Sequence, residues 1–256
     1  MEALRLVKIG GKLLDDASAL EQVIRDFSKI DGPKILVHGG GKKASELCRK
    51  MGIQPQLKEG RRITDETTLD IVTMVYAGLL NKNIVSQLQS HACNAIGFSG
   101  ADANMIRSKK RAANPIDFGF VGDIETINSV LLKRLLNQGL TPVFCAITHD
   151  GKGQLLNTNA DTIAASLAAT LANDFEVLLK FCFEKEGVLA NPLDDASVFP
   201  FLSKKEYELY RQKGTISDGM IPKLDNAFAA KAANVHRVMI CGVSGIFEQK
   251  GTEICL

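Results

Sequence analysis

The stretch KILVHGGG, residues 34–41, decides how this chain is expected to fold. Its first five residues form a short apolar run typical of a buried strand. Residues 42–51 follow with helical spacing, and Gly52 suits the position just after a helix end. Three glycines between a strand and a helix leave backbone N–H groups free to face an anion. The stretch therefore predicts a strand-to-helix turn that can bind an anionic ligand.

The same kind of junction occurs earlier, where residues 4–9 read as a strand that ends at Gly10 and Gly11. Short apolar runs then alternate with helical patterns along the chain. Further strands are expected at residues 94–98, 142–147, 176–181 and 237–241, with a β-hairpin at 104–127. Further helices are expected at residues 18–30, 65–91, 129–137, 160–171, 203–213 and 222–233. This alternation predicts an α/β fold in which helices cover both faces of a mostly parallel sheet.

Some helix boundaries are also predicted. Ser18 and Glu21 have the spacing of a capping box. Thr64 is expected to cap the long helix at residues 65–91, and Gly78 is the expected point of interruption within it.

The composition argues against several classes of function. The 256 residues carry a net charge of +2 and are 23% charged, which argues against a polybasic nucleic-acid binder. The short basic run at residues 109–111 is typical of a solvated loop tip. The six cysteines form no CxxC pair, so buried reduced thiols are expected rather than a zinc or redox site. Without a membrane-spanning stretch or a signal-peptide pattern, we expect a cytoplasmic protein.

Two lysines occupy positions where a free cation is unfavourable. Lys8 lies inside the first strand; if buried it needs an anion, whereas on an edge strand it would reach solvent. Lys223 lies at a helix start, where a bound anion would offset its repulsion by the helix dipole; a simply exposed lysine is the alternative. Asp161 follows Asn157 and Asn159, and Asn159 can cap the helix. These three residues suit the orientation of a polar substrate and of neighbouring lysines.

The glycine turn permits other interpretations. Gly39, Gly41 and Ala44 satisfy G-x-G-x-x-A, and Glu59 lies about 20 residues further on, as a dinucleotide site requires. A nicotinamide-dependent dehydrogenase is therefore one alternative, although that fingerprint usually follows the first strand. The P-loop pattern G-x-x-x-x-G-K-[ST] is absent. A non-catalytic ligand-binding module is a further alternative.

Six stretches resemble, in chain order, the amino acid kinase family: residues 8–11, 37–41, 60–64, 118–123, 156–161 and 217–223. The resemblance implies a three-layer αβα sandwich, in which a lobe of residues 1–173 binds an acylated glutamate and a lobe of residues 174–256 binds ATP. It implies ATP-dependent phosphorylation of the γ-carboxylate of N-acetyl-L-glutamate, a step of arginine biosynthesis, by a homodimer. N-succinyl-L-glutamate, or a different acid or nucleotide, is an alternative substrate.

The resemblance also implies roles for single residues. Lys8 and Lys223 would neutralise the transferring phosphoryl group, and Asp161 would hold the two lysines in place. Arg62 would clamp a substrate carboxylate with its guanidinium, and Asn157 would bind the substrate backbone. Mg²⁺ would be held by the nucleotide phosphates and water. The residues implied in binding substrate, phosphate or nucleotide are Gly10, Gly11, Gly40, Gly41, Arg62, Asn157, Ser217 and Gly219.

Two stretches depart from the family pattern. Residues 180–189, KFCFEKEGVL, stand where the family usually has a shorter segment with an aspartate that contacts the nucleotide. Residues 97–104 match only in part and are expected near the acyl end of the substrate. The acyl group is therefore the part of the predicted substrate that stays open.

Overall fold

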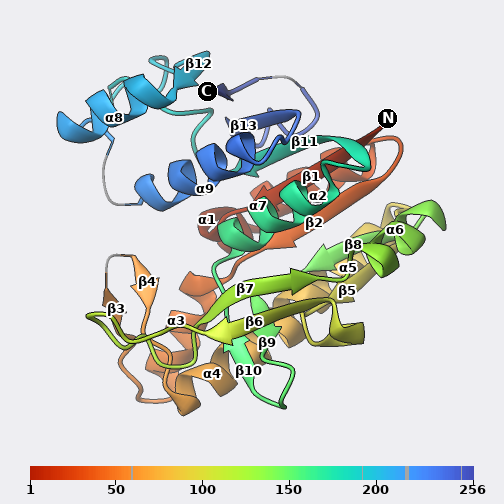
Figure 1. Cartoon of the computed structure of the whole chain (residues 1–256), viewed down its shortest axis with the longest axis vertical. Helices are drawn as coiled ribbons and strands as arrows, with labels where there is room; N and C mark the ends of the chain where they lie inside the picture. Colours follow the sequence, from red (N-terminus) through yellow and green to blue (C-terminus); the bar gives the residue numbers. More distant parts are fainter. Residues whose placement is uncertain (59, 192, 217–218, 249) are drawn as a thin grey trace.

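A largely parallel sheet forms the middle layer of the molecule (Figure 1). The computed structural model describes residues 1–58, 60–191, 193–216, 219–248 and 250–256. Within these residues the central sheet has eight strands, in the order β12-β14-β13-β11-β1-β2-β8-β5. Their bounds are β1 (Glu2–Ile9), β2 (Lys34–His38), β5 (Ala95–Phe98), β8 (Thr141–Phe144), β11 (Phe175–Cys182), β12 (Phe201–Ser203), β13 (Arg237–Cys241) and β14 (Thr252–Cys255). The described neighbours pair in parallel apart from β13 and β14, which confirms the mostly parallel sheet.

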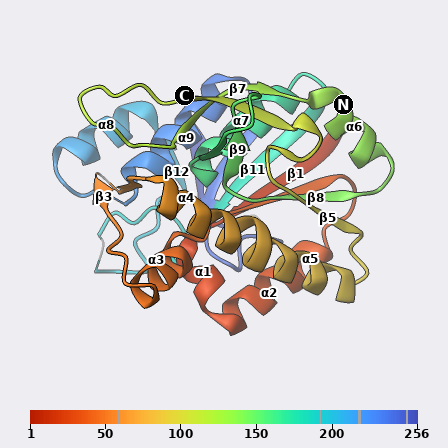
Figure 2. The same cartoon turned by 90° about the horizontal axis from the view of Figure 1, so that it is seen from below.

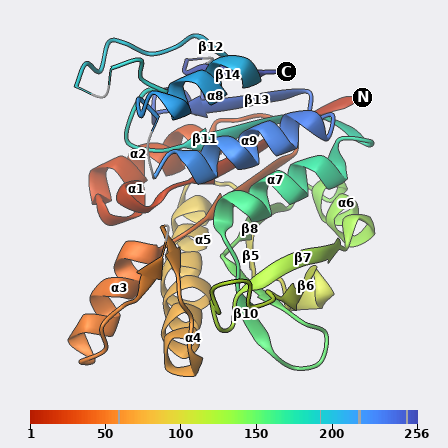
Figure 3. The ribbon, with the colours of Figure 1, turned by 60° about the vertical axis from the view of Figure 1, so that its left-hand side comes forward.

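Helices cover both faces of this sheet, as the alternation predicts. α2 (Ala17–Ser28) and α5 (Asn81–Ser90) lie together on one face (Figure 2). α7 (Ala160–Leu171) and α9 (Ile221–Ala232) lie side by side on the other (Figure 3). The other described helices are α1 (Gly11–Asp15), α3 (Gly41–Lys50), α4 (Glu66–Thr73), α6 (Ser129–Asn137), α8 (Lys204–Gln212), the π-helix η1 (Met74–Leu80) and the 3-10 helix η2 (Asp102–Asn104).

Smaller sheets lie beyond the central one. A four-stranded sheet has the order β10-β9-β6-β7, and its antiparallel pair β6 and β7 is the predicted hairpin. A two-stranded hairpin of β3 and β4 carries Arg62. The bounds of these strands are β3 (Leu57–Lys58), β4 (Arg61–Arg62), β6 (Ile106–Lys110), β7 (Gly122–Ile127), β9 (Ile147–His149) and β10 (Leu155–Asn157).

The strand predicted at residues 142–147 is wrong as a single unit. β8 belongs to the central sheet, whereas β9 belongs to the four-stranded sheet. Between them, the carbonyl of Ala146 accepts a hydrogen bond of 3.0 Å from the N–H of Thr158. The chain therefore changes sheets inside one apolar run, because β10 and Thr158, a short way further along the chain, take over its backbone groups.

Two helix starts also differ from the predictions. Asp16 caps α2 and accepts a hydrogen bond of 2.9 Å from the N–H of Ser18. The predicted capping box of Ser18 and Glu21 is therefore wrong, because a carboxylate two residues earlier takes up the free N–H groups. Likewise, Asp65 caps α4 in place of Thr64. The predicted long helix continues without a break past Gly78, but its α-helical pattern changes to the π-helix η1, which contains this residue.

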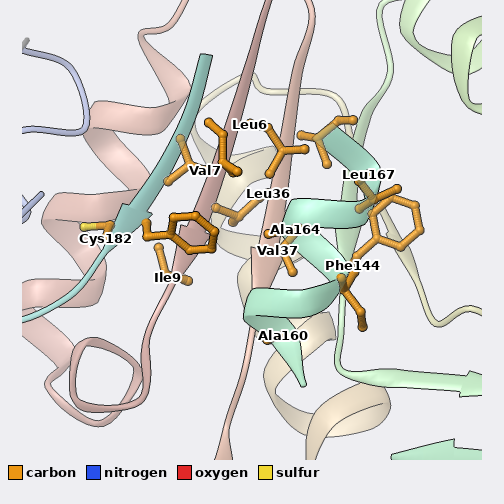
Figure 4. Close-up of a cluster of buried hydrophobic side chains, with 14 of the residues drawn as sticks. Leu6, Val7, Ile9, Leu36, Val37, Phe144, Ala160, Ala164, Leu167 and Cys182 are labelled. Carbon is orange, nitrogen blue, oxygen red and sulfur yellow. The ribbon is translucent and has the colours of Figure 1, made fainter. Parts of the chain in front are cut away.

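The packing of α7 on β1 and β2 builds the core beneath the carboxyl ends of these strands (Figure 4). Leu6 and Val37 on the strands are fully buried and, like Lys8, point to the face of the sheet that α7 covers. On the helix, Ala164 has a small side chain, which lets α7 lie close to the sheet. Full burial of each larger aliphatic side chain contributes about 1.5–3 kcal/mol. The packing therefore holds the ends of β1 and β2 next to the start of α7.

Candidate active site

Two glycine turns meet at the carboxyl ends of neighbouring strands. β1 and β2 pair in parallel with Ile9 opposite His38, so both turns leave the sheet at the same edge. Ligands of such sheets bind beyond this edge. A cavity of about 300 Å³ lies there, lined by both turns and by the start of α7. Helix N-termini and glycine turns both present N–H groups, so this position favours an anion.

A buried ion pair lines the cavity. Lys8 is only 5% exposed, and its Nζ lies 2.7 Å from Oδ1 of Asp161. Asp161 stands in the first turn of α7, which the side chain of Asn159 caps by accepting the N–H of Asp161 at 2.8 Å. The anion that a buried lysine requires is therefore present, and the alternative of a solvent-reaching Lys8 is wrong. Removing either partner would leave the other charge buried without compensation.

The second predicted lysine shares this electrostatic environment. Lys223 lies on α9 next to Pro222, which lines the cavity. Burial lowers the pKa of Lys223, and the charge of Lys8 lowers it further, whereas Asp161 and Glu184 oppose the shift. Lys8 and Lys223 therefore lie near the same carboxylate of Asp161 and repel each other, and an additional anion between them would be stabilised.

The π-helix η1 forms a wall behind the second glycine turn. Gly40 has a φ of +152°, a backbone conformation that side chains rarely adopt. A Cβ atom at this position would collide with Leu80 and lie 2.9 Å from Cδ1 of Tyr76. Only glycine fits here without a shift of η1, and the turn can therefore bring its backbone close to a ligand.

Arg62 is buried beside this turn with part of its guanidinium unused. Its Nη2 donates to the carbonyl of Gly41 at 2.7 Å and to the hydroxyl of Ser45 at 2.6 Å. Its Nη1 is buried, and no described residue accepts a hydrogen bond from it. Burial raises the pKa of the nearby Tyr76, and the charge of Arg62 opposes that rise. A held guanidinium with a free nitrogen suits a carboxylate.

Asn157 is held in a fixed orientation at the end of β10. Its Nδ2 donates to the hydroxyl of Thr64 at 3.0 Å, and its backbone N–H donates to the carbonyl of Phe120 at 2.9 Å. Thr64 is itself completely buried. The amide of Asn157 therefore reaches the cavity from a rigid support.

The described lining of the cavity carries far more positive than negative charge. Its cationic side chains belong to Lys8, Lys42, Arg61, Arg62 and Arg111. Asp161 is the only acidic side chain among the described lining residues. Arg111 is held by Asp123, with 3.0 Å between Nε and Oδ1. The prediction of a solvated loop tip at residues 109–111 is therefore wrong, because Lys109 and Lys110 are exposed residues of β6 and Arg111 lines the cavity. The lining as a whole attracts a polyanion.

Most of the predicted site residues gather at this cavity. Those that line it are Lys8, Gly11, Gly40, Gly41, Arg62, Asn157 and Asp161. Gly10 is absent from the described lining, and its N–H donates to the carbonyl of Cys182 at 3.0 Å, so this N–H is not free for a phosphate. Gly219 is exposed and lies outside the described lining. Ser217, and Glu59 of the alternative dinucleotide fingerprint, lie outside the described residues.

Several lining residues were not found by sequence patterns. Tyr76 lies inside a helix, and the π-helical turn that aims it at the cavity has no pattern of its own. Asn226 could have been found, since it follows Lys223 by three residues on the same helix and so lies on the same face. Residues 97–104, expected near the acyl end, are absent from the described lining.

The described part of the chain offers neither a metal site nor a membrane span. No group of three or more His, Cys, Asp or Glu side chains is placed there to hold a metal ion. No helix among these residues is long and apolar enough to cross a membrane. Of the six free cysteines, only Cys255 is partly exposed, which confirms the prediction of buried thiols.

The chain is similar to known proteins over nearly its whole length. Residues 3–242 match the amino acid kinase family. The acetylglutamate kinase of Phocaeicola vulgatus is 51% identical over 253 residues, which cover 99% of this chain and 98% of that protein. The acetylglutamate kinase of Parabacteroides distasonis is 50% identical over 254 residues, which cover 99% and 100%. The solved structure of smu.665 from Streptococcus mutans UA159 has a TM-score of 0.82 at 25% identity and covers 98% of each chain.

Proposed function

Since the chain belongs to the amino acid kinase family, we propose that ATP phosphorylates the γ-carboxylate of N-acetyl-L-glutamate in the cavity between the two glycine turns. The reaction moves the γ-phosphoryl group of ATP onto a carboxylate oxygen and leaves ADP and an acyl phosphate, in a step of arginine biosynthesis. The buried ion pair of Lys8 and Asp161 beside both turns is the observation that carries the proposal. The 51% and 50% identical acetylglutamate kinases support the choice of acid.

The acid binds on the Arg62 side of the cavity. Its α-carboxylate accepts a hydrogen bond from the free Nη1 of Arg62, which Gly41 and Ser45 hold in place from the other side of the guanidinium. The amide of Asn157 binds the backbone of the substrate. Because both anchors are fixed by their own partners, they orient the acid without a large loss of side-chain entropy.

Charge neutralisation at the phosphoryl group is the role of the two lysines. Phosphoryl transfer depends mainly on positioning and on stabilising charge over the transferring group. Lys8 and Lys223 supply the positive charge, and the N–H groups of Gly11, Gly40 and Gly41 bind phosphoryl or carboxylate oxygens. Asp161 positions Lys8 rather than acting as a base, because the ammonium group lies 2.7 Å from its carboxylate.

The nucleotide is held by the second lobe, residues 174–256, and the acid by the first, residues 1–173. Magnesium is proposed to enter with the nucleotide. Asp161, the only acidic side chain among the described lining residues, is already engaged by Lys8, so the lining does not fit a protein cage for the ion. The phosphates of ATP and water fit it better, as is usual for Mg²⁺.

Release of ADP tests the proposal directly. The purified protein is incubated with ATP, Mg²⁺ and one acceptor at a time: N-acetyl-, N-succinyl- or free glutamate, aspartate, carbamate or UMP. The expected result is turnover with an N-acylglutamate and none with UMP. The ratio of kcat/KM for the acetyl and succinyl compounds then decides the acyl group. ATP binding without turnover on any acceptor would favour a non-catalytic binding module and overturn the proposal.

We further propose that the protein works as a homodimer in the cytoplasm. The dimer and its location are proposed from the resemblance to the amino acid kinase family. Sedimentation equilibrium of the purified protein, with a monomer mass of 27.7 kDa, is expected to give twice that mass. A monomer at micromolar concentration would contradict it.

A further inference from the structure

A buried histidine stands directly behind the second glycine turn. His38 is the last residue of β2 and has no exposed surface. It is not among the described residues that line the cavity, but the next three residues along the chain, 39–41, are. Its imidazole therefore cannot touch a ligand in the cavity, yet it contacts the backbone that does.

Both ring nitrogens of His38 have a defined partner. Nδ1 lies 2.8 Å from the carbonyl oxygen of Gly39, which can only accept, so Nδ1 carries the proton. Nε2 lies 3.1 Å from Nδ2 of Asn81, which can only donate, so Nε2 is unprotonated. The orientation of the Asn81 amide is fixed in turn, because the same Nδ2 donates to the carbonyl of Val143 at 3.0 Å. The network selects a single neutral tautomer.

The bond from Nδ1 determines where the next N–H group points. The carbonyl of Gly39 and the N–H of Gly40 belong to one trans peptide and point in opposite directions. With the carbonyl held against the buried imidazole, the N–H of Gly40 points away from it, on the side of the cavity. No described residue accepts this N–H. Leu80 and Tyr76 close the space on the Cα side of Gly40, so the peptide has little freedom to rotate.

We propose that His38 is a positioning residue, whose Nδ1–H holds the Gly39–Gly40 peptide so that the N–H of Gly40 donates to the oxygen of the transferring phosphoryl group. The inference rests on the proposed phosphoryl transfer. Asn81 acts one step further back, by keeping Nε2 free of a proton. Since both nitrogens are engaged and burial lowers the pKa of His38 to about 4, the imidazole is neutral and takes no proton from the substrate.

Two substitutions separate positioning from simple packing. The amide of asparagine reaches the place of Nδ1, whereas that of glutamine reaches the place of Nε2. His38→Asn therefore keeps a donor for the carbonyl of Gly39, and His38→Gln does not. We expect His38→Asn to keep kcat within about threefold of the native value and His38→Gln to lose at least about tenfold. The KM for ATP is expected to change by less than about twofold in both.

Two results would contradict the proposed role of His38. Equal losses of kcat in the two variants would reduce His38 to a packing residue, and unchanged kcat in His38→Gln would also overturn the inference. Thermal unfolding of both variants shows whether they remain folded under the assay conditions. Because native protein is measured in the same assay, its inactivity would count against the proposed function alone.

A second measurement needs no variant. Nitrogen NMR of protein labelled with ¹⁵N-histidine distinguishes the two neutral tautomers and the cation. The signals of His38 are expected to show a protonated Nδ1 and a bare Nε2 from about pH 6 to about pH 8, since the folded pKa of about 4 lies below this range. A proton on Nε2, or titration within that range, would contradict the inference whether or not the enzyme turns over.

Discussion

At the scale of single residues, the nearly buried charges of Lys8 and Asp161 stabilise each other. Lys8 and Asp161 are each 5% exposed, and their side chains are 2.7 Å apart. A pair of this kind adds little to the free energy of folding, since the cost of desolvation offsets most of the attraction. It does fix the ammonium group of Lys8 at one place, and a fixed charge is what phosphoryl transfer requires.

The first prediction therefore concerns Lys8. Lys8→Met is expected to lower kcat by about 10² to 10³, because it removes a fixed positive charge from the transferring group. Lys34→Met is the matched control: Lys34 is also a buried strand lysine, but its Nζ donates to the carbonyls of Ser28 and Ile30, away from the cavity. The control is expected to lose stability but to keep its kcat. Both are measured by ADP release and urea unfolding, and similar kcat values for the two variants would refute the role of Lys8.

The second prediction concerns Tyr76, whose hydroxyl lies beside Arg62 at the cavity. Tyr76→Phe removes one oxygen and leaves the ring against Gly40. The KM for the acylglutamate is expected to rise roughly tenfold, because the loss of the hydroxyl removes one hydrogen bond to a charged group. The KM for ATP is expected to change little. Tyr207→Phe is the control, because its hydroxyl bonds Asp225 at 2.8 Å and does not line the cavity. A rise in the KM for ATP instead would move Tyr76 to the nucleotide side.

At the scale of elements, local chemistry made some helices predictable to the residue. α6 runs from Ser129 to Asn137 and α7 from Ala160 to Leu171, as expected from the sequence. Each begins after an asparagine whose side chain caps it, Asn128 and Asn159. A cap and an apolar stripe lie within one stretch of chain, so a sequence pattern contains both.

Other elements depend on partners far along the chain and could not be predicted. The edge strand β12 and its neighbour β14 are short and have no long apolar run, and their pairing alone defines them. The π-helix η1 is a further case. Its wider turn places Tyr76 and Leu80 against the second glycine turn, and Asn81 beside it bonds His38; these contacts lie outside any local sequence pattern.

The third prediction compares Gly40, which packs against η1, with Gly78, which lies within η1. Gly40→Ala is expected to lower kcat by about 10² and to cost about 1–3 kcal/mol of stability, because its Cβ would collide with Leu80 and its φ is +152°. Gly78→Ala is expected to add about 0.5–1 kcal/mol, because nothing lies within 4 Å of its Cβ and the residue is helical. Urea unfolding and ADP release measure both. Equal stability changes in the two variants would show that η1 does not constrain the turn.

At the scale of the whole molecule, the site exists because the sheet brings distant segments to one edge. Lys8, Arg62 and Asp161 lie far apart in the sequence, and alternation of strands and helices predicts only that a ligand binds at that edge. The ordered resemblance to the amino acid kinase family then indicated which residues meet there. Neither predicted Arg111 or Tyr76 in the lining, because both reach it through tertiary contacts, to Asp123 and Gly40.

The last prediction links this architecture to pH. Burial lowers the pKa of His38 to about 4, against 6.5 for an unperturbed histidine, because the core that supports the glycine turn excludes water from the ring. The unfolded chain therefore binds a proton more readily than the folded protein. The contribution of His38 to stability is fully present above pH 6.5 and is lost as the pH falls towards 4. Between about pH 7.5 and about pH 5 the loss amounts to about 2 kcal/mol.

His38→Asn supplies the matched control, since asparagine does not titrate. Urea unfolding of both proteins at about pH 7.5, 6 and 5 isolates the histidine, because the carboxylates contribute equally to the two curves. The native protein is expected to lose about 2 kcal/mol more than the variant over this range, so the stability gap between them closes on acidification. Parallel curves would mean that the ring titrates normally in the fold. The neutral, single tautomer behind the glycine turn would then be lost on acidification below about pH 6.5, and with it the donor that holds the N–H of Gly40 towards the cavity.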